Sequence, residues 1–208
     1  EGRLLWPVRQ MGRILTDMGK TFVSVKRIME ILEEPAEEDL PGAGTPPIEG
    51  EILFEQVSFS YEEGNKVLKE VSVRIPKGAT VAVLGPTGCG KSTFVHLIAG
   101  LYPCNSGRIL IDGTPVEKIR RAWLRSHVGL VLQEPFLYSK SLKENIGIKE
   151  ETPRDEDVHA AARDAAIHEV IMEMEKGYET AVGERGVTLS GGQKQRVAMA
   201  RTLMAPYP

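Results

Sequence analysis

The chain is 208 residues long, of which 41% are hydrophobic and 26% are charged. This apolar content suffices for one substantial globular domain with an appendage, and it excludes a generally disordered chain. The formal net charge is -3, with basic residues dispersed among acidic ones, which argues against nucleic acid as a partner.

Cysteine content and hydropathy indicate a reducing, cytosol-facing compartment. The two cysteines, Cys89 and Cys104, are too few for a disulfide framework, and Cys89 lies in a glycine-rich loop where a bridge would obstruct a ligand. No stretch approaches the roughly 18 consecutive apolar residues of a membrane span, and the N-terminus lacks the apolar core of a signal peptide. The chain by itself is therefore expected to be soluble.

Residues 1–34 predict one long amphipathic helix. Apolar residues recur at alternating steps of four and three, which places them on one stripe. The stripe consists of Leu4, Val8, Met11, Leu15, Met18, Phe22, Val25, Met29 and Leu32. Charged residues occupy the other faces, so the pattern favours a packing helix or a coiled-coil seam, but it does not name the partner.

Residues 35–50 predict a linker, because prolines and glycines alternate there with acidic residues and break any helix. Residues 51–208 then predict an α/β domain. Residues 52–61 and 67–75 alternate apolar and polar positions, as in two antiparallel strands. Residues 79–85 form a continuous apolar run, typical of a strand buried on both faces, before a glycine loop and a helix.

Further strands are expected at residues 106–112 and 127–133, and residues 155–176 are expected to be helical. Strands mixed with helices indicate an α/β core with an antiparallel addition.

The glycine loop has the spacing of a phosphate-binding loop, in which two glycines separated by four residues precede Lys and Ser. Its residues are Gly85, Pro86, Thr87, Gly88, Cys89, Gly90, Lys91, Ser92 and Thr93. The glycines let backbone amides converge on phosphate oxygens, and Lys91 adds a cation for the β- and γ-phosphates. Ser92 can ligate Mg²⁺, while Thr93 would contact the α-phosphate region or cap the helix. The alternative is an ordinary glycine turn before a helix.

A second glycine element starts at Leu189, where Ser190, Gly191 and Gly192 precede a helical pattern. A helix N-terminus of this kind can meet an anion. The residues alone favour the simpler interpretation, an ordinary helix capped by Ser190.

The two glycine elements together, in this order, resemble the ATP-binding-cassette (ABC) family from about Glu51 to the C-terminus. The resemblance implies a P-loop NTPase core of ABC type with an antiparallel β addition and a helical subdomain. It also implies that two such domains pair head to tail around two ATP molecules. The signature residues Leu189, Ser190, Gly191, Gly192 and Gln193 would then meet a γ-phosphate held by a second nucleotide-binding domain.

Two more residues match the family pattern. Tyr61 stands where the family stacks an aromatic ring on adenine, although a lone strand tyrosine is otherwise core or surface filler. Gln133 matches the glutamine that reaches Mg²⁺ and the attacking water and links the site to the transmembrane domain. Without the resemblance, Gln133 is only a polar residue at a strand end.

Residues 180–186, with Glu184, resemble a segment by which exporters contact membrane helices of the partner subunit. The resemblance therefore implies an exporter, with residues 1–34 as the cytoplasmic end of its last transmembrane helix. ATP binding and hydrolysis by the longer protein, at the cytoplasmic face of a membrane, would power export of a substrate that the sequence does not identify. The partners implied are a second nucleotide-binding domain and the transmembrane domains.

The chain departs from the family after the signature helix. The family continues with an apolar strand ending in Asp-Glu and then a switch histidine, neither of which precedes Pro208. The chain as it stands is therefore expected to bind Mg-ATP without hydrolysing it, and its four histidines are interpreted as structural or surface residues. Two alternatives remain open: a soluble ABC-family ATPase outside transport, and a nucleotide-binding module without turnover.

Overall fold

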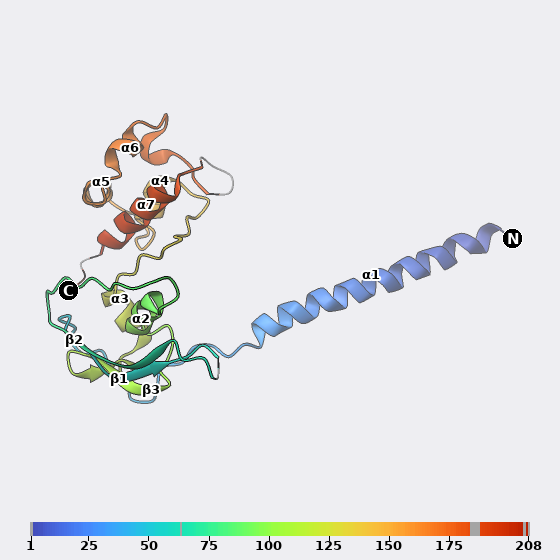
Figure 1. Cartoon of the computed structure of the whole chain (residues 1–208). Helices are drawn as coiled ribbons and strands as arrows, with labels where there is room; N and C mark the ends of the chain where they lie inside the picture. The colour runs from blue at the N-terminus through green and yellow to red at the C-terminus, as the bar shows by residue number, and fades with distance from the viewer. Residues whose placement is uncertain (1, 63, 184–187, 206, 208) are drawn as a thin grey trace. The chain divides into compact units, whose positions relative to one another are not determined.

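The computed structural model describes residues 2–62, 64–183, 188–205 and 207. Contacts divide the chain into two units, Glu1–Glu38 and Asp39–Pro208, and each unit is described by itself (Figure 1). The division is close to the start of the segment that the sequence predicts as a linker.

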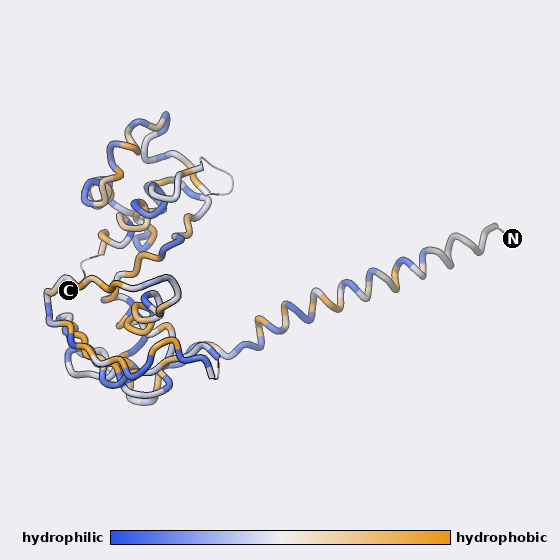
Figure 2. Tube along the Cα trace, in the orientation of Figure 1, coloured by the Kyte–Doolittle hydropathy of each residue, from blue (hydrophilic) through white to orange (hydrophobic). Residues whose placement is uncertain are grey.

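The first unit contains the helix predicted from the apolar stripe. Helix α1 spans Gly2–Leu32, and apolar and polar residues follow one another along it (Figure 2). Within the unit the stripe is uncovered, since Leu15 and Phe22 are 65% and 68% exposed. The side chains of Leu4 and Val8 lie outside the described residues. Among the described helices, none combines the length and the apolar character that crossing a bilayer requires.

Most of the segment predicted as a linker belongs to the second unit and is hydrogen-bonded within it. The Asp39 carboxylate accepts from the Arg121 backbone N–H at 2.8 Å, and Gly44 pairs with the backbone beside Ile119. The Trp123 indole N–H donates to the Pro46 carbonyl at 2.7 Å. A composition rich in proline, glycine and acidic residues therefore does not prevent this stretch from packing against the domain.

Asp112 fixes the end of the same segment. Its carboxylate accepts from the backbone N–H groups of Glu49, Gly50 and Glu51 at 2.7, 3.1 and 3.0 Å. Burial acts to raise the pKa of Asp112, but these three N–H donors outweigh it and hold that pKa below its ordinary value. An ionised side chain thus ties the incoming chain to the turn that follows the third strand.

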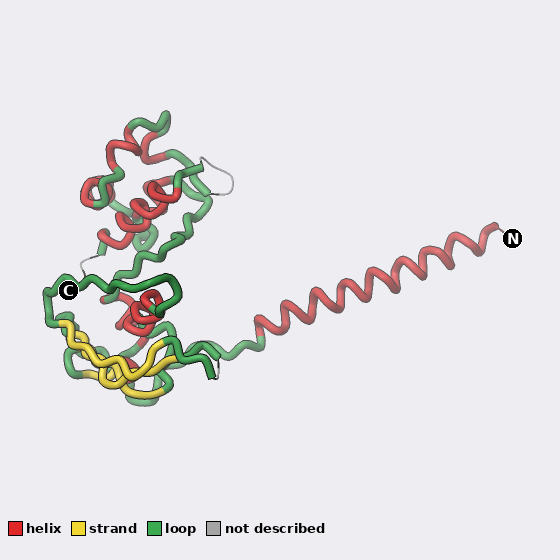
Figure 3. The backbone as a smooth tube through the Cα atoms, viewed as in Figure 1, coloured by secondary structure: helices red, strands yellow, loops and turns green. Residues whose placement is uncertain are grey.

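The sheet of the second unit is antiparallel throughout, in the order β2-β1-β3-β4. Its strands, yellow in Figure 3, are β1 (Ile52–Phe59), β2 (Leu68–Ile75), β3 (Ser106–Ile111) and β4 (Thr114–Pro115). Ile52 opposes both Ile75 of β2 and Ile111 of β3, so β1 lies between these two strands. The strands predicted near residues 52–61, 67–75 and 106–112 are present.

Helix α2 (Lys91–Ile98) covers one face of this sheet. Phe54 of β1 stacks on Phe94 of α2 with ring centroids 4.4 Å apart, and Leu97 is fully buried beside them. After β4 come η1 (Val116–Lys118) and α3 (Arg121–His127). The sheet core therefore fixes the helix that follows the phosphate loop.

The strands predicted at residues 79–85 and 127–133 are wrong for this structure. Residues 79–85 and 128–133 run as loops, while His127 is the last residue of α3. Val81, Val83 and Leu84 are 50%, 44% and 90% exposed. A strand requires neighbours that accept and donate backbone hydrogen bonds. Among the described residues no backbone hydrogen bond joins residues 80–84 or 128–133 to another segment. An apolar run predicts burial, but burial on both faces also needs those neighbours.

The remaining helices form a second core in the same unit. They are α4 (Leu142–Ile146), α5 (Asp155–Asp164), α6 (His168–Met172) and α7 (Gly191–Leu203), with η2 (Gly177–Glu179) between α6 and α7. Ile146, Val158, Ile171 and Val197 are fully buried in it. The helical stretch predicted at residues 155–176 is thus two helices, separated by a turn in which Ala166 has a φ of 53°. The fold is mixed α/β with an antiparallel sheet and a helical subdomain.

Candidate nucleotide-binding site

The phosphate loop ends at an uncapped helix N-terminus. Gly90 is the N-cap of α2, with a φ of 94° and no side-chain cap. The first N–H groups of α2 consequently have no acceptor within the helix. At Gly88, whose φ is 84°, a Cβ atom would have nothing within 4 Å. The loop therefore presents open space and backbone donors to an anion.

Lys91 is folded onto the loop that precedes it. Its ammonium donates to the carbonyl oxygens of Gly85 and Pro86 at 2.9 and 2.8 Å, and lies 3.7 Å from the Cys89 sulfur. The positive charge is thus held at the loop by neutral acceptors. A phosphate group is a stronger acceptor for an ammonium than a carbonyl oxygen is.

One cavity of about 500 Å³ lies beside the loop and brings together residues far apart in sequence. Lys91 and Ser92 of α2 line it together with Gln133. The rest of its lining consists of Val81, Val83, Val95, His96, Leu130, Val131, Leu132, Gln195 and Met199. The two apolar segments that do not form strands are therefore walls of this cavity.

The donor set fits Mg²⁺. The Ser92 hydroxyl and the Gln133 amide oxygen are hard, neutral oxygen ligands, and Mg²⁺ retains several waters and binds mainly through substrate phosphates. The described residues contain no group of three or more His, Cys, Asp or Glu side chains that could hold a metal by itself. A magnesium site here would thus depend on a bound phosphate chain.

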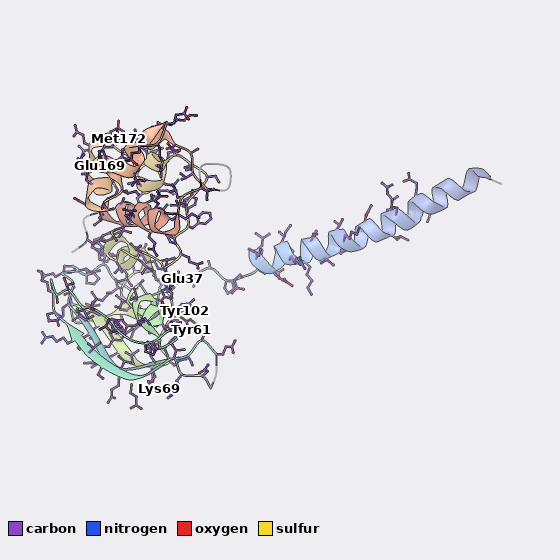
Figure 4. All side chains as sticks on the ribbon, turned by 45° about the horizontal axis from the view of Figure 1, so that its top comes forward. Glu37, Tyr61, Lys69, Tyr102, Glu169 and Met172 are labelled. Atoms are coloured by element: carbon purple, nitrogen blue, oxygen red, sulfur yellow. The ribbon has the colours of Figure 1, made fainter. Side chains whose placement is uncertain are left out.

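Tyr61 lies next to the loop but does not line the cavity. Its hydroxyl is 3.0 Å from the Thr93 hydroxyl, and its ring is about half exposed. Tyr102 lies beside it with ring centroids 5.2 Å apart and a perpendicular arrangement (Figure 4). One part of the Tyr61 ring is thereby fixed, and the other remains accessible for stacking.

The signature element lies at a different helix N-terminus and does not line the cavity. The Ser190 hydroxyl accepts from the Gln193 backbone N–H at 3.3 Å, and the Gln193 side chain accepts from the Ser190 N–H at 2.8 Å. Leu189 is buried in the helical core, while Gly191 and Gly192 are exposed with open space around them. Within this chain, the structure does not bring the signature to the phosphate loop.

Sequence reasoning missed three polar or polarisable residues of the cavity, His96, Gln195 and Met199. The Nδ1 atom of His96 is buried and has no hydrogen-bond partner among the described residues. Gln195 lies two residues beyond the signature, and that position in the motif was the available signal. Glu184, the residue predicted to contact membrane helices, lies outside the described residues.

Comparisons with known proteins establish the family. The model of the family described as "ABC transporter" matches residues 68–208, and the chain belongs to this family. It is a nucleotide-binding domain homologous to those of exporter-type members. The family binds ATP.

Two curated relatives and one solved structure illustrate the similarity. The chain is 41% identical over 204 residues to human ATP-binding cassette sub-family B member 6, covering 97% of this chain and 24% of that protein. It is 43% identical over 209 residues to the putative multidrug export ATP-binding/permease protein YgaD of Bacillus subtilis (strain 168), covering 99% and 36%. A structure of a bacterial Atm1-family ABC exporter with ATP bound matches with a TM-score of 0.82 at 33% identity, covering 100% and 36%. The chain thus spans well under half of each of these proteins.

Proposed function

We propose that the chain binds Mg-ATP in the cavity beside the phosphate loop, and that this binding powers export in a longer membrane protein. The observation that carries the proposal is that Lys91, Ser92 and Gln133 line one cavity. A cation, a hydroxyl and a carboxamide suit a polyphosphate with a hydrated divalent cation. Similarity to proteins named as exporters supports the transport role.

Each residue has a distinct task in this proposal. The loop amides and Lys91 hold phosphate oxygens, and Tyr61 offers the exposed part of its ring to adenine. Ser92 and Gln133 contribute oxygen ligands for Mg²⁺. Bound Mg²⁺ supplies neutralisation of phosphate charge.

Nucleotide-binding domains of ABC exporters generally dimerise and pair with transmembrane domains. We propose the same partners here, with Leu189–Gln193 facing a γ-phosphate held by the second domain. The openness around Gly191 and Gly192 supports this arrangement, because a phosphate chain could approach the α7 backbone closely. The longer protein would act at the cytoplasmic face of a membrane.

The chain as it stands is proposed to bind ATP without steady hydrolysis. Among the described residues that line the cavity, none is a carboxylate that could polarise a water beside Gln133. Phosphate release measured at saturating Mg-ATP should therefore stay at background. Steady release that disappears in the Lys91→Ala variant would overturn this part of the proposal.

Isothermal calorimetry tests the binding site itself. Lys91→Ala should weaken Mg-ATP binding about ten- to hundredfold, because a charge-assisted hydrogen bond contributes about 1.5–3 kcal/mol. Lys69→Ala is the matched control, since Lys69 is exposed on β2 and outside the cavity lining (Figure 4). Equal affinity of the Lys91→Ala variant and the unaltered chain would refute the assignment.

A further inference from the structure

Gln133 is held by the helix that follows the signature. The side-chain amide of Gln195, on α7, donates through Nε2 to the backbone carbonyl of Gln133 at 2.9 Å. Gln195 and Gln133 both line the cavity that Lys91 and Ser92 also line. One hydrogen bond thus joins α7 to the residue proposed to approach Mg²⁺.

The same helix contacts the chain on both sides of Gln133. A Cβ atom added at Gly129 would lie only 2.6 Å from the Thr202 side chain, so the backbone there passes close to α7. The Arg201 guanidinium donates to the Phe136 carbonyl at 3.1 Å. Residues 129–136 therefore lie along α7, and Gln195 provides the contact nearest the cavity.

Arg201 also secures the far end of this segment through Asn145. Its Nε donates to the Asn145 carbonyl at 2.8 Å, and its Nη2 donates to the Asn145 side-chain oxygen at 3.0 Å. Asn145 is fully buried, and its Nδ2 donates to the carbonyls of Tyr138, Lys140 and Ser141. The end of the segment away from the cavity is thus anchored in the helical core.

The support from α7 matters because the sheet gives none. Residues 128–133 have no backbone hydrogen bond to another segment among the described residues, and Gln133 itself is exposed. Among the described residues, Gln195 therefore supplies the hydrogen bond that ties the Gln133 backbone to another segment. Fixing that carbonyl restricts the direction in which the Gln133 side chain leaves the backbone.

We propose that Gln195 is a positioning residue. It holds the Gln133 backbone against α7 so that the Gln133 side chain is oriented toward the Mg²⁺ of bound nucleotide. The proposal rests on the proposed Mg-ATP site. It predicts that Gln195 contributes to the Mg²⁺-dependent part of ATP affinity and not to the part that persists without Mg²⁺. It also makes the first turns of α7 responsive to the occupancy of the cavity in the same chain.

The test compares ATP affinity with Mg²⁺ and with EDTA for the chain and for Gln195→Met, which keeps the side-chain length and removes the donor. The ratio of the ATP affinity with Mg²⁺ to the ATP affinity in EDTA should fall about three- to tenfold in Gln195→Met, as expected for one net hydrogen bond. Affinity in EDTA should stay unchanged. Lys194→Met is the matched control, because Lys194 is an exposed neighbour on α7 outside the cavity lining, and its ratio should equal that of the unaltered chain.

Each other outcome overturns the inference in a recognisable way. A ratio in Gln195→Met equal to that of the unaltered chain shows that the hydrogen bond does not position Gln133. An equal loss with Mg²⁺ and with EDTA shows a general structural role instead. If the unaltered chain binds no ATP, or binds it independently of Lys91, the proposed function itself fails, and the inference fails with it.

Hydrogen exchange of the nucleotide-free chain gives a second readout that does not use ATP. Amides in residues 129–136 should exchange faster in Gln195→Met than in Lys194→Met, because the segment has lost a contact to α7. Peptides from β1 and β2 should exchange alike in both variants. Equal exchange of residues 129–136 in the two variants contradicts the proposal even if Gln195→Met proves less stable overall.

Discussion

The two glycine-rich helix starts of this chain differ in how their backbone N–H groups are satisfied. Helix α2 begins at Gly90 with no side-chain cap and with the Lys91 ammonium close by. Helix α7 begins at Ser190 with a complete capping box formed with Gln193. The first start is left open for an anion, whereas the second is stable by its own side chains.

This difference shows that a shared motif type does not imply a shared local role. At α2, Lys91 and Ser92 line a cavity of the same chain. At α7, the signature residues do not line that cavity, whereas Gln195 and Met199 further along the helix do. In the proposed head-to-tail pairing, a second domain would complete the ATP-binding surface to which the signature contributes.

The same substitution at the two helix starts should give the largest contrast. Gly90→Ala should destabilise the chain by about 1–3 kcal/mol, because a φ of 94° disfavours any side chain and a Cβ there would lie 2.9 Å from Leu68. A Cβ atom at Gly191 would meet nothing within 4 Å, and Gly191 does not have the positive φ of Gly90, so the stability of Gly191→Ala should match that of the unaltered chain. Urea unfolding of both variants measures the contrast, and equal losses would remove the distinction between the two glycine elements.

Ser92 of α2 and Ser190 of α7 should show the opposite order, because here the substitution at α7 should lower the unfolding free energy more. The loss should be smaller than that at Gly90. Ser190→Ala removes the α7 cap and should cost about 1 kcal/mol of unfolding free energy. Ser92→Ala lies in the first turn of α2, whose N-terminus has no side-chain cap, and should change stability by less than about 0.5 kcal/mol. Both values come from the same unfolding experiment. A larger loss for Ser92→Ala would mean that α2 depends on a cap after all.

The smallest expected effect is a difference between the capping boxes of α7 and α4 in how their contribution to stability depends on pH. At α4 the Ser141 N–H donates to the Glu144 carboxylate at 2.9 Å, which holds the pKa of Glu144 below its ordinary value. This contribution is present above the unfolded-state pKa of about 4.3 and is lost as pH falls through the depressed folded-state pKa. The α7 box uses Gln193, which does not titrate.

Melting temperatures measured from neutral pH down to pH 3 can detect this difference. The Glu144→Gln variant should lose less stability on acidification than the unaltered chain does. Glu175→Gln, which changes an exposed carboxylate outside both capping boxes, serves as the control. Parallel acid profiles for Glu144→Gln and the unaltered chain would show that the α4 box does not depend on charge.

Local patterns predicted the elements whose determinants are local. The stripe from Leu4 to Leu32 predicted α1, and the alternation of apolar and polar residues predicted β1 and β2. The strands predicted at residues 79–85 and 127–133 are wrong because an apolar run predicts burial only. It does not show whether a neighbouring segment can form backbone hydrogen bonds with it. The prediction of a linker at residues 35–50 did not include its attachment to Asp112 and Trp123, because these residues are distant in sequence.

For the candidate site, spacing was informative only within single motifs. The phosphate loop was identified from contiguous residues, and Gln133 came from the family resemblance. That Lys91 and Gln133 share a cavity depends on tertiary packing. The position of Gln195 just beyond the signature was a signal that it lies near the site, but its hydrogen bond to the Gln133 carbonyl depends on tertiary packing, since it joins residues 62 apart in the chain.

The folded-back Lys91 makes nucleotide binding an exchange of acceptors. Two carbonyl oxygens already accept from the ammonium, so a ligand has to compete with them for its N–H donors. A chain of several charged phosphates is a stronger competitor than a ligand with one weak acceptor. We therefore expect the folded-back lysine to raise the threshold for weak anions and so to select ligands by their charge density.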